Sequence, residues 1–122
     1  MKKILFAVLL SAPLSAFAGG HMDVIRLTLN EGCSLGQLLE IRDDFNVWGA
    51  EYGYQSRIAM PIQGSDINSL FWIGESADAA TFGAAWDAWR DGLSDADSAP
   101  AKLWARFQAC STNQERYGYD VY

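Results

Sequence analysis

The order of strand-like and helix-like periodicities limits the folds that this chain can adopt. Alternating apolar residues predict a strand over 24–29. Apolar residues at steps of three and four then predict a helix that begins after Ser34 and ends at Gly53. Two further strands are predicted, over 54–60 and, as a short apolar run buried on both faces, over 70–73.

The second half of the chain continues this pattern. A second helical stripe starts near Asp78, a short helix runs from Pro100 to Cys110, and alternation over 115–122 predicts a last strand. The full order is strand, helix, strand, strand, helix, short helix, strand. It predicts an α+β fold of the ferredoxin-like βαββαβ type, with an antiparallel sheet and helices on one face.

The first 18 residues have the features of a signal peptide. Lys2 and Lys3 precede an apolar run, and Ala16-Phe17-Ala18 supplies the small residues of a cleavage site. A membrane span needs about 20 apolar residues, and this run is shorter. No later segment is long and apolar enough to be a membrane anchor. We therefore expect a single domain over 19–122, exported to the periplasm or the extracellular space.

The charge of the chain argues against two classes of partner. Among 122 residues, 15 are Asp or Glu and 9 are Lys or Arg, which gives a net charge of -6. Removal of the leader would take away two of those lysines. Nucleic acid and anionic lipid surfaces both require clustered Lys and Arg, so we expect neither as a partner.

The two cysteines, Cys33 and Cys110, lie near opposite ends of the predicted domain. In an oxidising compartment, a single distant pair usually forms a disulfide. Closing so long a loop would contribute about 4 to 5 kcal/mol on the chain-entropy account. The sequence therefore predicts a Cys33–Cys110 disulfide.

Large aromatic residues on the predicted helices and strands can line a cleft for a flat apolar ligand. Stripes of this spacing also describe a packed aromatic core, and both interpretations remain open here. Arg57 would be the polar anchor for a ligand carboxylate or enolate if its side chain faced the cleft. The candidate pocket residues are Trp48, Tyr52, Arg57, Trp72, Trp86 and Trp89.

The order of elements, the Trp-bearing first helix, the segment 82–89 with its two tryptophans, and the late extra helix resemble the dimeric α+β barrel superfamily. That superfamily includes cofactor-independent monooxygenases of the antibiotic-biosynthesis type and stress-responsive barrel proteins. The resemblance covers nearly all of 23–122. It implies a homodimer with sheets face to face and no cofactor, and it transfers no catalytic residue.

In such a fold, one face of the sheet has no helices. We expect Arg26, Thr28, Arg57 and Trp72 on that face. An uncovered face rich in aromatic residues is typical of an interaction surface. The expected partner is a second copy of the chain.

Two classes of function follow, a binder of a small apolar or aromatic molecule and a cofactor-independent enzyme that acts on one. Oxygenation without a cofactor needs donors for developing negative charge, which Asn46, Tyr52 and Arg57 can supply. A Ser-His-Asp triad is excluded, because the single histidine, His21, has no predicted element to hold it.

A third possibility concerns the mature amino terminus. Cleavage after Ala18 would expose Gly19-Gly20-His21, whose amine, two peptide nitrogens and imidazole can form a square-planar site for Cu(II) or Ni(II). The tripeptide resembles the amino-terminal copper and nickel binding motif. Three alternatives are open: cleavage shifted by a residue, a tripeptide that is a flexible spacer, or a Gly20-His21-Met22 segment that is a cloning remnant.

Overall fold

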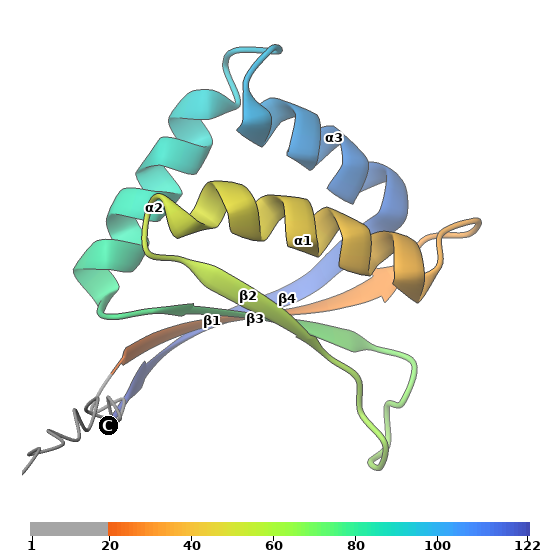
Figure 1. Ribbon diagram of the computed structural model, residues 1–122. Helices are drawn as coiled ribbons and strands as arrows, with labels where there is room; N and C mark the ends of the chain where they lie inside the picture. Colours follow the sequence, from red (N-terminus) through yellow and green to blue (C-terminus); the bar gives the residue numbers. More distant parts are fainter. Residues whose placement is uncertain (1–19) are drawn as a thin grey trace, which may run out of the picture.

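The computed structural model describes residues 20–122, and its elements follow the predicted order (Figure 1). The expected leader, residues 1–18, and Gly19 lie outside the described residues. The elements are β1 (Gly20–Leu29), α1 (Leu35–Ala50), β2 (Gln55–Ala59), β3 (Leu70–Ser76), α2 (Ala79–Gly92), α3 (Ala99–Cys110) and β4 (Ser111–Val121).

The four strands form one sheet in the order β2-β3-β1-β4. Every neighbouring pair is antiparallel. All three helices lie on the same side of this sheet, and α3 lies near α1 and α2 (Figure 1). This is the ferredoxin-like plan with an extra helix, so the expected fold class is confirmed. It is also the plan that the resemblance to the dimeric α+β barrel superfamily implies.

Side-chain caps fix where the helices begin. Ser34 accepts a hydrogen bond from the Gln37 backbone N–H, and the Gln37 side chain accepts one from the Ser34 backbone, which completes a capping box. Asp78 and Ser98 cap α2 and α3 by accepting hydrogen bonds from the backbone N–H groups of Thr81 and Ala101. Asp78 is thus the N-cap of α2, whose first helical residue is Ala79.

Three strands are longer than the side-chain pattern predicts. β1 begins at Gly20, β3 continues to Ser76, and β4 begins at Ser111. β1 is the central partner of β3 and β4, so backbone pairing extends over residues whose side chains do not alternate. The polar start of β4, from Ser111 to Gln114, has no apolar alternation by which it could be predicted.

The position of His21 corrects one expectation. His21 belongs to β1, where it pairs with Ser76 on β3 and Asp120 on β4. Its ring centroid lies 4.6 Å from that of Phe82, and its Nδ1 lies 3.3 Å from Asp120 Oδ1. A folded strand therefore holds this histidine.

Alternation along the strands separates a helix-covered face from an uncovered face. Leu70, Trp72, Gly74 and Ser76 are the buried residues of β3, so Trp72 lies under the helices and not on the uncovered face as expected. The residues between them are only partly buried, which corrects the expectation that β3 is buried on both sides.

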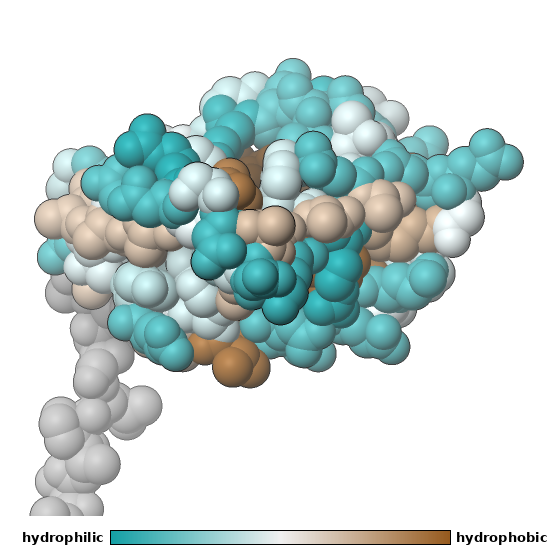
Figure 2. Space-filling view, turned by 90° about the horizontal axis from the view of Figure 1, so that it is seen from above, coloured by the Kyte–Doolittle hydropathy of each residue, from teal (hydrophilic) through white to brown (hydrophobic). Residues whose placement is uncertain are grey.

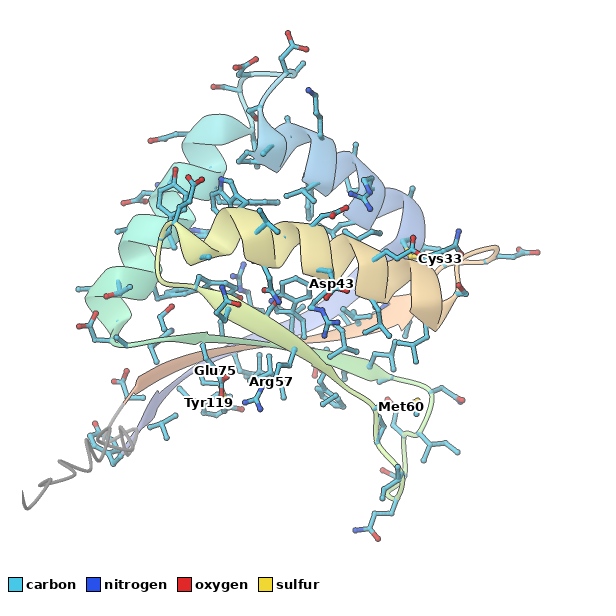
Figure 3. All side chains as sticks on the ribbon, viewed as in Figure 1. Cys33, Asp43, Arg57, Met60, Glu75 and Tyr119 are labelled. Atoms are coloured by element: carbon cyan, nitrogen blue, oxygen red, sulfur yellow. A yellow bond between two sulfur atoms is a disulfide. The ribbon has the colours of Figure 1, made fainter. Side chains whose placement is uncertain are left out.

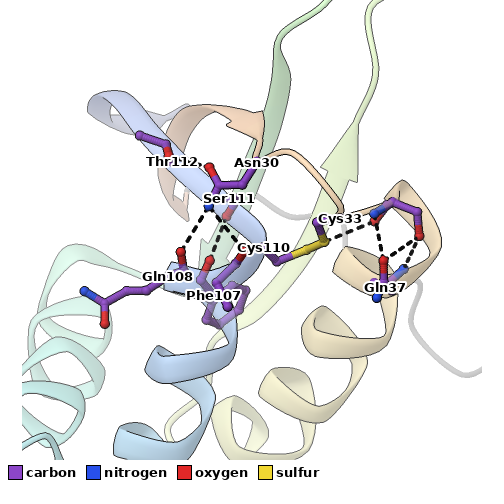
Figure 4. The surroundings of a disulfide bond; sticks show 10 residues. Asn30, Cys33, Gln37, Phe107, Gln108, Cys110, Ser111 and Thr112 are labelled. Carbon is purple, nitrogen blue, oxygen red and sulfur yellow. Dashed lines mark hydrogen bonds between the residues drawn. A yellow bond between two sulfur atoms is a disulfide. The ribbon is translucent and has the colours of Figure 1, made fainter.

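The disulfide joins the loop after β1 to the end of α3 (Figure 4). The Cα atoms of Cys33 and Cys110 are 5.1 Å apart and the two residues are 77 positions apart in sequence. Asn30 reinforces this junction, because its side-chain amide donates to the carbonyl oxygens of Gln108 and Ala109. The predicted Cys33–Cys110 pairing is confirmed.

Candidate functional site

A cavity of about 480 Å³ lies between the covered face of the sheet and the helices. Pockets of about 300 to 1,000 Å³ are usual for small-molecule sites. Viewed from the helix side, hydrophobic residues show in a hollow between more polar surfaces (Figure 2). The aromatic lining residues are Phe45, Trp48, Tyr54, Trp72, Phe82, Trp86, Trp89, Trp104 and Phe107.

These rings pack on one another as well as lining space. The Phe45 ring centroid lies 5.0 Å from that of Trp72 and 5.3 Å from that of Trp89. Trp48 and Trp89 meet edge to face at 5.2 Å. The aromatic residues therefore form both the core of the domain and the wall of the cavity, so the two interpretations of the sequence describe one structure.

One corner of the cavity is polar and is built around Asp23, which is 2% exposed. Arg116 donates to both oxygens of this carboxylate, from Nε at 2.8 Å and from Nη2 at 2.6 Å. The Tyr54 hydroxyl donates to Asp23 at 3.1 Å, and the indole N–H of Trp72 donates to the Tyr54 oxygen at 2.9 Å. This polar corner, Asp23, Tyr54, Trp72 and Arg116, compensates a buried charge with paired donors.

The environment of Tyr54 sets its protonation state. Burial, reinforced by the negative charge of Asp23, raises the pKa of Tyr54 well above its ordinary value. The phenol therefore stays protonated at neutral pH and acts as a hydrogen-bond donor. It is not a base in this site.

Arg116 reaches the cavity because of a bulge in β4. Arg26 pairs with Glu115 and Leu27 pairs with Asn113, so Gln114 is an additional residue in the strand. Because side chains alternate with a period of two, this insertion puts both Asn113 and Arg116 on the cavity side. The Arg116 guanidinium carbon lies 4.2 Å from the ring centroid of Trp86, in cation–π geometry.

The structure brings together four of the six residues that the sequence suggested for the pocket. Trp48, Trp72, Trp86 and Trp89 all line the cavity. Tyr52 does not, although its ring packs against Trp48 with centroids 4.7 Å apart.

Arg57 lies on the uncovered face of the sheet, the second of its two suggested positions, so it is not the polar anchor of the cavity (Figure 3). Its neighbour Ser56 is buried on the covered face, so alternation directs Arg57 away from the cavity. The Arg57 side chain is 67% exposed, and its Nη2 donates to Glu75 Oε1 at 2.6 Å.

The side chain of Asn46, another suggested donor, already makes hydrogen bonds within the protein. Its side chain accepts from the backbone N–H and hydroxyl of Ser56 at 2.8 Å and donates to the Ser56 carbonyl at 2.9 Å. It fastens α1 to the start of β2. None of the three suggested donors, Asn46, Tyr52 and Arg57, lines the cavity.

The polar corner was not predicted from the sequence, although the position of Asp23 in its strand indicates it. Asp23 is in phase with Ile25 and Leu27, so it occupies the apolar face of β1. A carboxylate in that phase must be paired when it is buried. Arg116 gave no such signal, because the larger apolar residues of that strand, Tyr117, Tyr119 and Val121, occupy the opposite phase.

The suggested metal chelate can be examined only in part, because Gly19 lies outside the described residues. Gly20 and His21 are paired within β1, opposite Val121 and Asp120. A chelate through their backbone nitrogens would therefore have to unpair the start of the strand. Over 20–122, no group of three or more His, Cys, Asp and Glu side chains is arranged to hold a metal ion.

None of the helices described within 20–122 has the length and apolar character needed to cross a membrane.

Gly74 leaves the space that Tyr54 occupies against β3. A Cβ at Gly74 would overlap the Tyr54 hydroxyl. Gly74→Ala should displace that hydroxyl from Asp23 and lower the free energy of unfolding by about 2 kcal/mol, as measured with urea.

Gly83→Ala is the matched control for this substitution. Outside its own helix, no atom lies within 4 Å of a Cβ built there. Alanine is favoured over glycine inside helices by up to about 1 kcal/mol, so this variant should be at least as stable as the parent. Equal unfolding midpoints for the parent and Gly74→Ala would contradict the placement of Tyr54.

No protein-family model matches the chain, and neither does any curated protein sequence. The similar solved structures include the following three. SnoaB, a cofactor-independent oxygenase from Streptomyces nogalater, is 20% identical with a TM-score of 0.48, over 84% of this chain and 92% of that one. A dimeric protein of unknown function and ferredoxin-like fold from Bacteroides fragilis is 7% identical with a TM-score of 0.43, over 84% and 94%. A protein from Pseudomonas aeruginosa is 15% identical with a TM-score of 0.48, over 87% and 95%.

Proposed function

We propose that this protein binds a small planar aromatic molecule in the cavity between its sheet and its helices. The observation that carries the proposal is an aromatic-walled space of about 480 Å³ with a buried polar corner. Offset and edge-to-face contacts with rings favour flat apolar ligands. A few fixed polar groups in an apolar pocket orient a ligand.

Rigidity of the wall supports the same proposal. Trp72 and Trp89 are 5% and 7% exposed, and each packs against Phe45. Trp72 is also held by its hydrogen bond to Tyr54. A wall that is ordered before the ligand arrives lowers the entropic cost of binding.

Filling part of the cavity should weaken ligand binding. Ala85 is buried in α2 and lines the cavity, so Ala85→Phe would occupy part of the space. We expect affinity for naphthalenemethanol, measured by calorimetry, to fall about tenfold or more, because a displaced ring loses its contacts.

Ala84→Phe is the control for this experiment. Ala84 is exposed on the same helix and does not line the cavity. It should leave the affinity unchanged. If Ala85→Phe stays folded by circular dichroism and binds the alcohol as tightly as the parent, the cavity is not the binding site.

An enzymatic role is the second candidate, and the polar corner is the observation that favours it. Oxygenation of an aromatic substrate develops negative charge, which the Arg116 guanidinium at the cavity wall can stabilise. The resemblance to cofactor-independent monooxygenases implies this chemistry. Oxygen consumption with phenolic ligands that bind the cavity separates an enzyme from a binder.

We also propose that a second copy of the chain covers the uncovered face of the sheet. Tyr117, Tyr119 and Val121 on β4 are 49%, 46% and 44% exposed, and the two tyrosine rings lie 6.4 Å apart. Phe71 and Ile73 extend this apolar surface across β3. An apolar strip of this kind on a sheet face suits a symmetric interface.

Ile73→Lys should convert the dimer to a monomer, because it buries an unpaired charge in the interface. Light scattering should then give the mass of one chain, whereas the parent gives about twice that mass. Val47→Lys is the control, since Val47 is 76% exposed on α1 and lies away from the sheet. A monomeric parent would contradict the proposed interface.

Export and metal binding remain proposals that depend on the leader. The Cys33–Cys110 disulfide supports an oxidising compartment. The intact mass of periplasmic protein would show whether cleavage follows Ala18. Copper titration of that form, with His21→Ala as control, tests the Gly-Gly-His chelate, whose visible absorption band should disappear in the variant.

A further inference from the structure

We infer that Arg116 makes the cavity selective for aromatic acids, that is, planar molecules whose ring carries a carboxylate. This inference rests on the proposed function, because it assumes that the cavity takes an aromatic ligand. The hydrogen-bonding groups of the polar corner that have no partner among the described residues indicate the class of ligand.

Asp23 has little capacity left for a ligand. Its Oδ1 accepts from Arg116 Nε, and its Oδ2 accepts from Arg116 Nη2 and the Tyr54 hydroxyl. The side chain is 3% exposed. A cationic ligand would therefore have to displace existing donors from a carboxylate that it can scarcely reach.

Arg116, in contrast, keeps donors for a ligand. A guanidinium carries five N–H groups, and two of them, one on Nε and one on Nη2, already donate to Asp23. Nη1 has no hydrogen-bond partner within residues 20–122, and the side chain, 38% exposed, lines the cavity. Stacking on Trp86 and the two bonds to Asp23 hold the guanidinium plane, so its free edge is positioned for a carboxylate.

The overall charge of the chain works against the binding of an acid, so a preference for the acid would point to a local cationic group. A net charge of -6 repels anions and attracts cations at long range. The other arginine of the cavity lining, Arg90, is paired with Asp87 at 2.8 Å. We therefore attribute a preference for an acid over a neutral or cationic analogue to Arg116, which Asp23 and Trp86 hold in place, rather than to Arg90, whose side chain is 59% exposed.

Three probes of the same ring system test the inference in the parent protein. Calorimetry should show that naphthoate binds about tenfold tighter than naphthalenemethanol, which corresponds to one charge-assisted hydrogen bond. Naphthylmethylammonium should bind more weakly than the alcohol. If the alcohol binds and the acid binds no tighter, the inference fails while the proposed function stands. If none of the three binds, the proposed function itself fails.

Two variants assign the preference to Arg116. Asp23→Asn removes the competing carboxylate and should increase the affinity for naphthoate several-fold further, with that for the alcohol unchanged. Asp23→Asn with Arg116→Met removes both charges together, so no buried charge is left unpaired. It should bind the acid and the alcohol equally.

Arg106→Met is the matched control, because Arg106 is an exposed arginine of α3 paired with Asp44. It should keep the preference for the acid. A preference that survives in the double variant would overturn the inference. Should the double variant not fold, the three probes on the parent and on Asp23→Asn still decide the question.

Discussion

Arg116→Met alone should lower the free energy of unfolding by about 3 kcal/mol, because it leaves the Asp23 carboxylate buried without its charged partner. Asp23 would keep only the hydrogen bond from Tyr54. This loss of stability lies at the lower end of the range for removing one partner of a buried ion pair. The reason is that the Arg116 side chain is 38% exposed, so its charge is partly solvated. Equilibrium unfolding in urea, followed by tryptophan fluorescence, measures this change.

A double-mutant cycle distinguishes the charge from the packing of the Arg116 stem. Asp23→Asn with Arg116→Met should recover a large part of the lost stability, because an uncharged amide needs no counter-ion. The remaining loss reports the contact between Arg116 and Trp86. Additive losses from the two single substitutions would contradict a direct ion pair in the polar corner.

Cys33→Ala with Cys110→Ala should lower the free energy of unfolding by about 4 to 5 kcal/mol. The cross-link closes a loop over a sequence separation of 77, so its removal greatly increases the freedom of the unfolded chain. Urea unfolding of the variant, compared with the oxidised parent, gives the value. The parent in strong reductant is the second measurement and should match the variant.

The disulfide also bears on the cavity. Cys110 ends α3 directly before Ser111 and Thr112, which line the cavity where β4 begins. Loosening this junction should therefore weaken ligand binding as well as stability. A loss of less than about 1 kcal/mol would mean that the hydrogen bonds of Asn30 hold the junction by themselves.

The fold could be predicted because its local signals agree with one another. The capping box at Ser34 and Gln37, the cap at Asp78 and the aromatic stripes all point to the helices that form. The ends of the strands could not be predicted, since the start of β4 is polar and is ordered by pairing with β1. Backbone hydrogen bonds between strands leave little trace in side-chain periodicity.

The walls of the site could be predicted better than its polar corner. Trp86 and Trp89 are three residues apart, and this spacing alone predicts that they lie on one face of a helix. Arg57 was a candidate both for the cavity and for the uncovered face, because alternation alone does not say which face of a strand is covered. Arg116 has the role expected of Arg57, and only the register of β4 reveals it.

The most direct test of the account is an NMR titration of the indole N–H resonances with naphthoate. The protein has five tryptophans, and all five line the cavity. Binding in the cavity should shift the resonances of Trp86 and Trp89 strongly and saturably, with backbone signals of Tyr117 and Tyr119 on the uncovered face little changed. Shifts confined to the uncovered face, or no saturable shift of any indole, would contradict a ligand site between the sheet and the helices.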